Sequence, residues 1–166
     1  LSLRRQRQMC IRDSGYFDNE KREYVIDNVA LPCSWTNYLG VEDMAAVINH
    51  TAGGYLFYKT PEYHRISRFR GNGVPMDRPG FYVYIRDNEK KDYHSISWQP
   101  VAKDLSKASY RCRHGLSYTV YESEYDGLAS SQTMVIPCGE NVLLWDVKVK
   151  NTTDAVRDLS LFTYME

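Results

Sequence analysis

The chain has 166 residues, which is enough for one domain with a hydrophobic core. Its 21 lysines and arginines balance its 21 aspartates and glutamates, so no strong field favours nucleic acid or an anionic membrane as a partner. No apolar run approaches about 18 residues, the length of a transmembrane helix, and the 14 tyrosines favour pleated sheet over a helix bundle.

Residues 1–14 (LSLRRQRQMCIRDS) differ from the rest of the chain, with four arginines and no periodicity. Their apolar part is too short and too broken for a signal peptide. The segment resembles translated sequencing-adaptor sequence, so we predict that residues 1–14 are non-native and disordered. A basic binding arm is the alternative. Residues 15–166 then form the domain.

Strands dominate the elements predicted after residue 14. The first is expected at residues 22–28 (REYVIDN). A short helix is predicted at residues 41–49 (VEDMAAVIN), because Glu42 and Asp43 are favourably placed in its first turn. Further strands are predicted at residues 54–59, 64–70, 80–87, 94–100, 109–115, 116–125 and 128–137. The pair Asp126-Gly127 predicts a hairpin between the last two of these strands.

The end of the chain has the clearest pattern. Residues 142–151 (VLLWDVKVKN) alternate as in a strand with one wet face, and the apolar positions are Leu143, Trp145, Val147 and Val149. Residues 159–166 (LSLFTYME) are apolar on both faces, so we expect burial on two sides. Roughly ten strands at short spacing indicate an all-β fold, an antiparallel β-sandwich. Because the sequence stops inside the last strand, we expect this sandwich to be truncated at its C-terminus.

Two adjacent glycines, Gly53 and Gly54, lead into the strand at residues 54–59. No helix is predicted after them and no Lys-Ser/Thr pair completes a phosphate-binding loop. We therefore expect them to let the chain bend from the short helix into the strand without steric cost.

Cysteine and histidine spacing argues against a metal site. The cysteines after residue 14 are odd in number and lack C-x-x-C spacing, which indicates neither a disulfide framework nor a zinc site and favours a reducing cytoplasm: Cys33, Cys112 and Cys138. The histidines lack H-x-x-x-H and H-x-H spacing and are predicted to be ordinary sheet or loop residues: His50, His64, His94 and His114. A Ser-His-Asp site stays open, because its members need not be close in sequence, but no G-x-S-x-G motif supports one.

The segment RISRFR, residues 65–70, concentrates positive charge. On a strand, Arg68 and Arg70 would share one face. Two guanidiniums on one face can hold carboxylate, phosphate or sugar oxygens, and they can equally pair with acids in a structural network. Both interpretations stay open at this point.

Seven segments, taken in order, resemble the N-terminal domain of the inverting β-disaccharide phosphorylases of glycoside hydrolase family 94, which includes the cellobiose and N,N′-diacetylchitobiose phosphorylases. The segments are GYFDNEKREYVI (15–26), WTNYLG (35–40), NHTAGGYLFYK (49–59), RISRFR (65–70), SWQPV (97–101), RHGLSYT (113–119) and NTTDAVRDLSLFTYME (151–166). Other stretches, such as DRPGFYVYIRD, look closer to the diacetylchitobiose branch.

The resemblance implies a β-supersandwich followed by an (α/α)-barrel that carries the catalytic aspartate. It implies phosphorolysis of a β-linked disaccharide, with inorganic phosphate as co-substrate, no cofactor or metal, and a homodimer. This chain lacks the barrel, so we expect it to contain no catalytic residue and to be inactive alone. By resemblance Tyr58 lies towards the partner subunit's acceptor site, and Arg68 and Arg70 match family arginines, which makes all three substrate-proximal candidates. The alternative is a stand-alone carbohydrate-binding or structural β-sandwich module.

Overall fold

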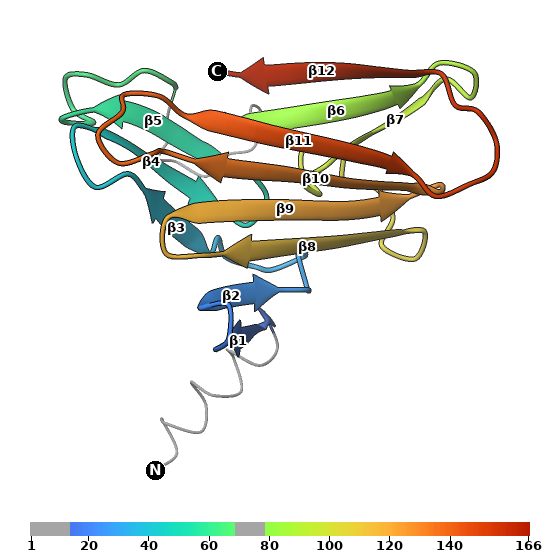
Figure 1. The fold of residues 1–166 in the computed structure, drawn as a ribbon, viewed down its shortest axis with the longest axis horizontal. Coiled ribbons are helices and arrows are strands. Elements are labelled where there is room, and N and C mark those ends of the chain that lie inside the picture. Colours follow the sequence, from blue (N-terminus) through green and yellow to red (C-terminus); the bar gives the residue numbers. More distant parts are fainter. Residues whose placement is uncertain (1–13, 69–78) are drawn as a thin grey trace, which may run out of the picture.

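The computed structural model describes residues 14–68 and 79–166, and these ranges fold as an all-β protein (Figure 1). The strands are β1 (Tyr16–Asp18), β2 (Glu23–Ile26), β3 (Thr36–Leu39), β4 (Met44–Asn49), β5 (Gly54–Tyr58), β6 (Phe81–Asp87), β7 (Asp92–Ser95), β8 (Ala108–His114), β9 (Tyr118–Tyr125), β10 (Leu128–Val135), β11 (Leu144–Asn151) and β12 (Leu159–Met165).

Three antiparallel sheets make up the two layers of the sandwich. The larger layer is a six-stranded sheet in the order β1-β2-β8-β9-β10-β11, in which β8 to β11 form a meander. The other layer contains the sheets β12-β6-β7 and β3-β4-β5. A bridge between Gly53 and Gly80 joins these two smaller sheets, and the Phe81 N–H donates to the Ala52 carbonyl at 2.9 Å. The prediction of an all-β antiparallel sandwich is therefore confirmed.

Side chains from all three sheets fill the space between the layers. The largest fully buried ones include Tyr82, Tyr121, Phe81, Ile26, Leu39, Ile48 and Ile85. The predicted apolar face of residues 142–151 packs against this core, and the Trp145 ring meets the Phe81 ring edge-on at a centroid distance of 5.9 Å. Burying these rings and aliphatic chains is the main source of stability for such a fold.

The β9–β10 hairpin has the turn that Asp126-Gly127 predicts. Both turn residues have positive φ, +49° for Asp126 and +76° for Gly127. This is the geometry of a type I′ turn, whose twist matches that of two antiparallel strands. Tyr125 pairs with Leu128 directly across the turn, so the hairpin register is set from its tip.

The two glycines lie where the turn after β4 leads into β5, and Gly54 is the first residue of that strand. Gly54 has a φ of +151°, and a Cβ atom at this position would lie 2.0 Å from the Val47 carbonyl oxygen, so a side chain cannot be accommodated there. The Asn49 side chain closes the turn, because its Oδ1 accepts from the Thr51 N–H at 2.9 Å and the Gly53 N–H at 2.8 Å. The expected bend is confirmed, although it connects two strands.

The helix predicted at residues 41–49 was wrong. Met44–Asn49 form β4, which pairs with β3 on one side and β5 on the other. Alternate residues point inward, and Ala46 and Ile48 are fully buried. Alanine and the acidic residues before it favour a helix locally, but pairing on both edges and burial of one face outweigh this weak propensity.

Other boundaries also differ from the predictions. Residues 64–68 contain only an isolated bridge, between Arg65 and Phe57, in place of the predicted strand, and residues 69 and 70 lie outside the described ranges. Strand β7 ends at Ser95, well before Pro100. The short strands β1 and β3 were not predicted.

The expected burial of residues 159–166 on two sides was wrong as well. Within the described ranges β12 pairs with β6 alone. The side chains of β12 are exposed to solvent: Leu161 is 49% exposed and Phe162 is 53% exposed. Because successive residues of a strand point to opposite faces, Leu161 and Phe162 show that both faces of β12 are open to solvent.

Candidate functional site

Tyr58 lies at the end of β5, beside two charged residues. Its hydroxyl donates a hydrogen bond to Asp43 Oδ2 at 3.0 Å. The Lys59 Nζ lies 3.9 Å from the same carboxylate oxygen and 5.2 Å from the centroid of the Tyr58 ring. We call these three residues the Tyr58 cluster. All three side chains reach solvent, so the cluster presents an aromatic ring, a carboxylate and an ammonium group on one small surface.

The backbone explains why these side chains meet. Residue 58 pairs with Met44 across the β4–β5 ladder, which brings the end of β5 next to the bend that precedes β4. Lys59 adopts a φ of +61°, and its N–H donates to the Asp43 carbonyl at 2.5 Å. The left-handed residue turns the chain sharply after β5, and the cluster is thereby fixed to the sheet.

Arg68 contacts the last residue of the chain. Its guanidinium forms a salt bridge with the Glu166 carboxylate, and its backbone N–H donates to the Glu166 carbonyl at 2.8 Å. The Tyr164 hydroxyl donates to the same carboxylate. Arg68 therefore ties the segment after β5 to the end of β12. Arg70 lies outside the described residues, so the predicted pairing of two arginines on one face stays a prediction.

The chemistry available at the Tyr58 cluster is recognition. A tyrosine ring can pack against an apolar sugar face, and carboxylate and ammonium groups can accept and donate hydrogen bonds to hydroxyls. No group of three or more His, Cys, Asp or Glu side chains that could hold a metal ion occurs in residues 14–68 and 79–166.

The buried histidines are part of the core. The His50 Nδ1 accepts from the Trp35 N–H at 3.2 Å, so the Nε2, at 3.1 Å from the Val29 carbonyl, carries the proton. Burial lowers the pKa of His50, and burial also lowers the pKa of His114 to about 4. Both rings are neutral near pH 7 and fix the Trp35 segment. The prediction that they are ordinary sheet or loop residues is confirmed for these two.

Two polar clusters occupy the opposite end of the sandwich, around the β9–β10 hairpin. In one, Arg157 forms salt bridges to Asp87 at 2.6 Å and to Asp126 at 2.9 Å. In the other, Asp92 accepts from Lys103 at 2.5 Å and from the Tyr125 hydroxyl at 2.6 Å. Partial burial raises the pKa of Asp92, but these hydrogen bonds outweigh it and lower the pKa to about 2.

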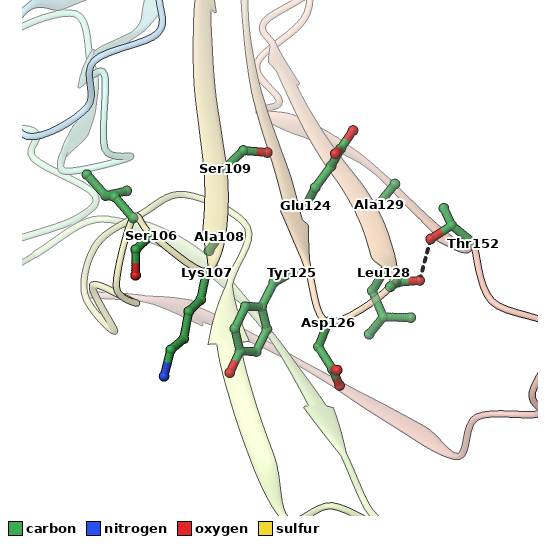
Figure 2. Close-up of a pocket in the computed structure, with 12 residues that line it drawn as sticks. Ser106, Lys107, Ala108, Ser109, Glu124, Tyr125, Asp126, Leu128, Ala129 and Thr152 are labelled. Atoms are coloured by element: carbon green, nitrogen blue, oxygen red, sulfur yellow. Dashed lines mark hydrogen bonds between the residues drawn. The ribbon is translucent and has the colours of Figure 1, made fainter.

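An open groove lies next to these clusters, at the tip of the β9–β10 hairpin (Figure 2).

Two features were not predicted from the sequence: this groove and the role of Asp43. The predicted helix placed Asp43 in a first turn, far from any partner on the strand that ends at Tyr58. One signal was available in the sequence. Ala46 and Ile48 are apolar at alternate positions, as in a strand, and a strand at residues 44–49 can pair with the strand at residues 54–58.

No helix within the described ranges has the length and apolar character needed to cross a membrane. This finding agrees with the absence of a long apolar run in the sequence.

Comparison with known proteins identifies the domain. Residues 22–166 match the family model for the glycosyl hydrolase 94 supersandwich domain. The chain is 53% identical over 152 residues to an N,N′-diacetylchitobiose phosphorylase of Vibrio proteolyticus and 51% identical to one of Vibrio furnissii, in each case over 92% of this chain. It is 29% identical to a solabiose phosphorylase of Paenibacillus borealis, again over 92% of this chain.

The chain spans about a fifth of the length of these relatives: 19% of each Vibrio protein and 20% of the Paenibacillus protein. The family model covers nearly all of the described residues, and the three-sheet architecture is the supersandwich that the model names. The chain belongs to glycosyl hydrolase family 94, of which it contains the supersandwich domain.

Proposed function

We propose that the protein containing this domain cleaves N,N′-diacetylchitobiose with inorganic phosphate. The observation that carries the proposal is the 53% identity over 152 residues to a protein that bears this activity in its name. In the reaction, a phosphate oxygen attacks the anomeric carbon, the glycosidic carbon–oxygen bond breaks, and the leaving oxygen takes a proton from a general acid. The products are an α-sugar 1-phosphate and a free sugar.

The role proposed for this domain is support of the reaction. Inversion with phosphate as nucleophile requires one general acid, and we place that acid outside this chain. The domain then contributes surface at the acceptor side of the site, in a cytoplasmic homodimer that needs no cofactor or metal. The Tyr58 cluster supports this role, because it presents sugar-recognition chemistry at the end of β5.

A phosphorolysis assay tests the proposal. The full-length gene product, given N,N′-diacetylchitobiose and phosphate, is expected to release N-acetylglucosamine 1-phosphate, and the 166-residue chain alone is expected to release none. A reaction without phosphate and a reaction with cellobiose serve as controls. Absence of phosphate-dependent cleavage by the full-length protein would reject the proposal and favour a binding or structural module.

A substitution at Tyr58 tests the place of this domain in the site. In the full-length protein, Tyr58→Ala is expected to raise the KM for the acceptor sugar in the synthetic direction about two- to tenfold, which is the effect of losing one aromatic packing contact of about 0.5–1.5 kcal/mol. The thermal midpoint is expected to stay close to that of the parent protein, because the side chain reaches solvent.

Two further variants make this test specific. Tyr58→Phe keeps the ring and removes the hydrogen bond to Asp43, so it is expected to have a smaller effect on KM than Tyr58→Ala. Tyr63→Ala is the matched control, because Tyr63 lies in the segment after β5 and is 75% exposed. Equal KM values for Tyr58→Ala and Tyr63→Ala would show that the Tyr58 cluster does not contribute to binding of the acceptor sugar.

A further inference from the structure

The groove at the β9–β10 hairpin has a volume of about 600 Å³, within the range of about 300–1,000 Å³ that small-molecule sites occupy. Its lining comes from the loop before β8, the start of β8, the end of β9 and the start of β10, with Thr152 at one side (Figure 2). It lies at the end of the sandwich away from β5 and the C-terminus (Figure 1), so it is separate from the Tyr58 cluster.

Strand register explains why the sheet is hollow here. Ser109, Glu124 and Ala129 stand side by side on the outer face of β8, β9 and β10. Two of these three side chains are small, so they leave space on either side of Glu124. The adjacent turn contributes Gly127, which has no side chain.

Hydrogen bonds hold both sides of the groove in place. On the hairpin side, the N–H and the hydroxyl of Thr152 both donate to the Gly127 carbonyl at 2.8 Å, and Arg157 donates to the Asp126 carbonyl at 2.8 Å. On the other side, the Lys107 N–H donates to the Asp104 carbonyl at 2.9 Å. A groove formed in advance loses little conformational freedom when a ligand binds.

The polar groups in the groove combine donors and acceptors. Within the described ranges the side chains of Lys107, Ser109 and Glu124 form no hydrogen bond or ion pair with the protein, and all three are exposed. Figure 2 shows Lys107 and Tyr125 extending on one side and Glu124 beside Ser109 on the sheet face. An ammonium donates, a carboxylate accepts and a hydroxyl does both.

This set of groups selects the class of ligand. A sugar hydroxyl also both donates and accepts, so it can pair with each of these groups, whereas a phosphate or other anion is repelled by Glu124, the carboxylate at the centre of the row. We propose that the groove binds a neutral oligosaccharide, at a site separate from the one where the disaccharide is cleaved.

Affinity electrophoresis tests this site without relying on phosphorolysis. The full-length protein is run in native gels that contain glycol chitin, hydroxyethyl cellulose, the anionic polymer dextran sulfate or no polymer. We expect retardation in at least one of the two neutral polymers, and the neutral polymer that retards the protein distinguishes N-acetylated from plain glucose chains. Migration unchanged by both neutral polymers would overturn the proposal, and so would retardation by dextran sulfate alone.

Variants assign the retardation to the groove. Ala129→Phe fills the space beside Glu124 and is expected to weaken binding at least about tenfold, which removes the retardation. Ser131→Phe is the matched control, because it lies two residues along the same outer face of β10 and outside the groove lining. Glu124→Ala, at an exposed position, is a second variant that removes an acceptor without adding volume. If Ala129→Phe and Glu124→Ala are both retarded as strongly as the parent protein, the proposal is wrong.

Discussion

Replacing Arg113 with methionine is expected to lower the free energy of unfolding by about 3 kcal/mol or more, because it removes one partner of a buried ion pair. The Glu23 side chain is only 2% exposed, and Arg113 reaches its carboxylate at 3.2 Å. The second nitrogen of the guanidinium binds Glu122 at 2.9 Å. Within the described part of the chain, the Glu23 carboxylate without Arg113 keeps one hydrogen bond, from the Tyr118 hydroxyl at 2.6 Å. Urea unfolding at pH 7 measures the loss.

The double variant and a neighbouring arginine make this prediction specific. Combining Arg113→Met with Glu23→Gln removes the uncompensated charge and is expected to recover about 1–2 kcal/mol. Arg111→Met, two residues earlier on the same exposed face of β8, is expected to change stability by no more than about 0.5 kcal/mol. If Arg111→Met and Arg113→Met cost the same, the pair has no special role.

This ion pair illustrates what sequence reasoning could and could not reach. Strand existence was predictable from local signals, such as the alternation in residues 142–151 and the turn at Asp126-Gly127. The contact between Glu23 and Arg113 joins residues 90 positions apart, and it depends on the pairing of β2 with β8. Nothing local in the sequence specifies that two distant strands are neighbours.

The candidate sites follow the same logic. Tyr58 and Arg68 could be singled out from their residue types and from a family resemblance. Their partners, Asp43 and Glu166, became visible only once the strands were paired. The groove also depends on register, because Ser109, Glu124 and Ala129 come from three strands and meet in one row. A row of this kind has no signature in the linear sequence.

Lowering the pH from about 6.5 to 4 is expected to destabilise the protein by about 3 kcal/mol for each of His94 and His114. Burial lowers the pKa of each ring from 6.5 to about 4. Because the folded pKa is below the unfolded one, the unfolded chain binds the extra protons as the pH falls through this window. Stability is therefore full above about pH 6.5, falls progressively, and receives no further loss from these rings below about pH 4.

The groups around His94 do not reverse this direction. Asp92 and Asp126 raise its pKa, but burial of the ring and the charge of Lys103 together outweigh them. The Asp92 carboxylate, whose pKa is lowered from 3.8 to about 2, loses its own contribution only below about pH 4, so it does not act in the histidine window.

Urea unfolding between pH 7 and pH 4.5 measures the expected dependence, and a variant assigns it. His94→Phe keeps a ring against Tyr125, whose centroid lies 5.2 Å from that of His94, and it removes one titrating group. We expect the slope of unfolding free energy against pH to decrease by up to about 1.4 kcal/mol per pH unit, the value for one proton. His64→Gln, at an exposed position, is the matched control. If His94→Phe leaves the slope unchanged, the buried ring does not control acid stability. The folded protein can then protonate this ring without unfolding.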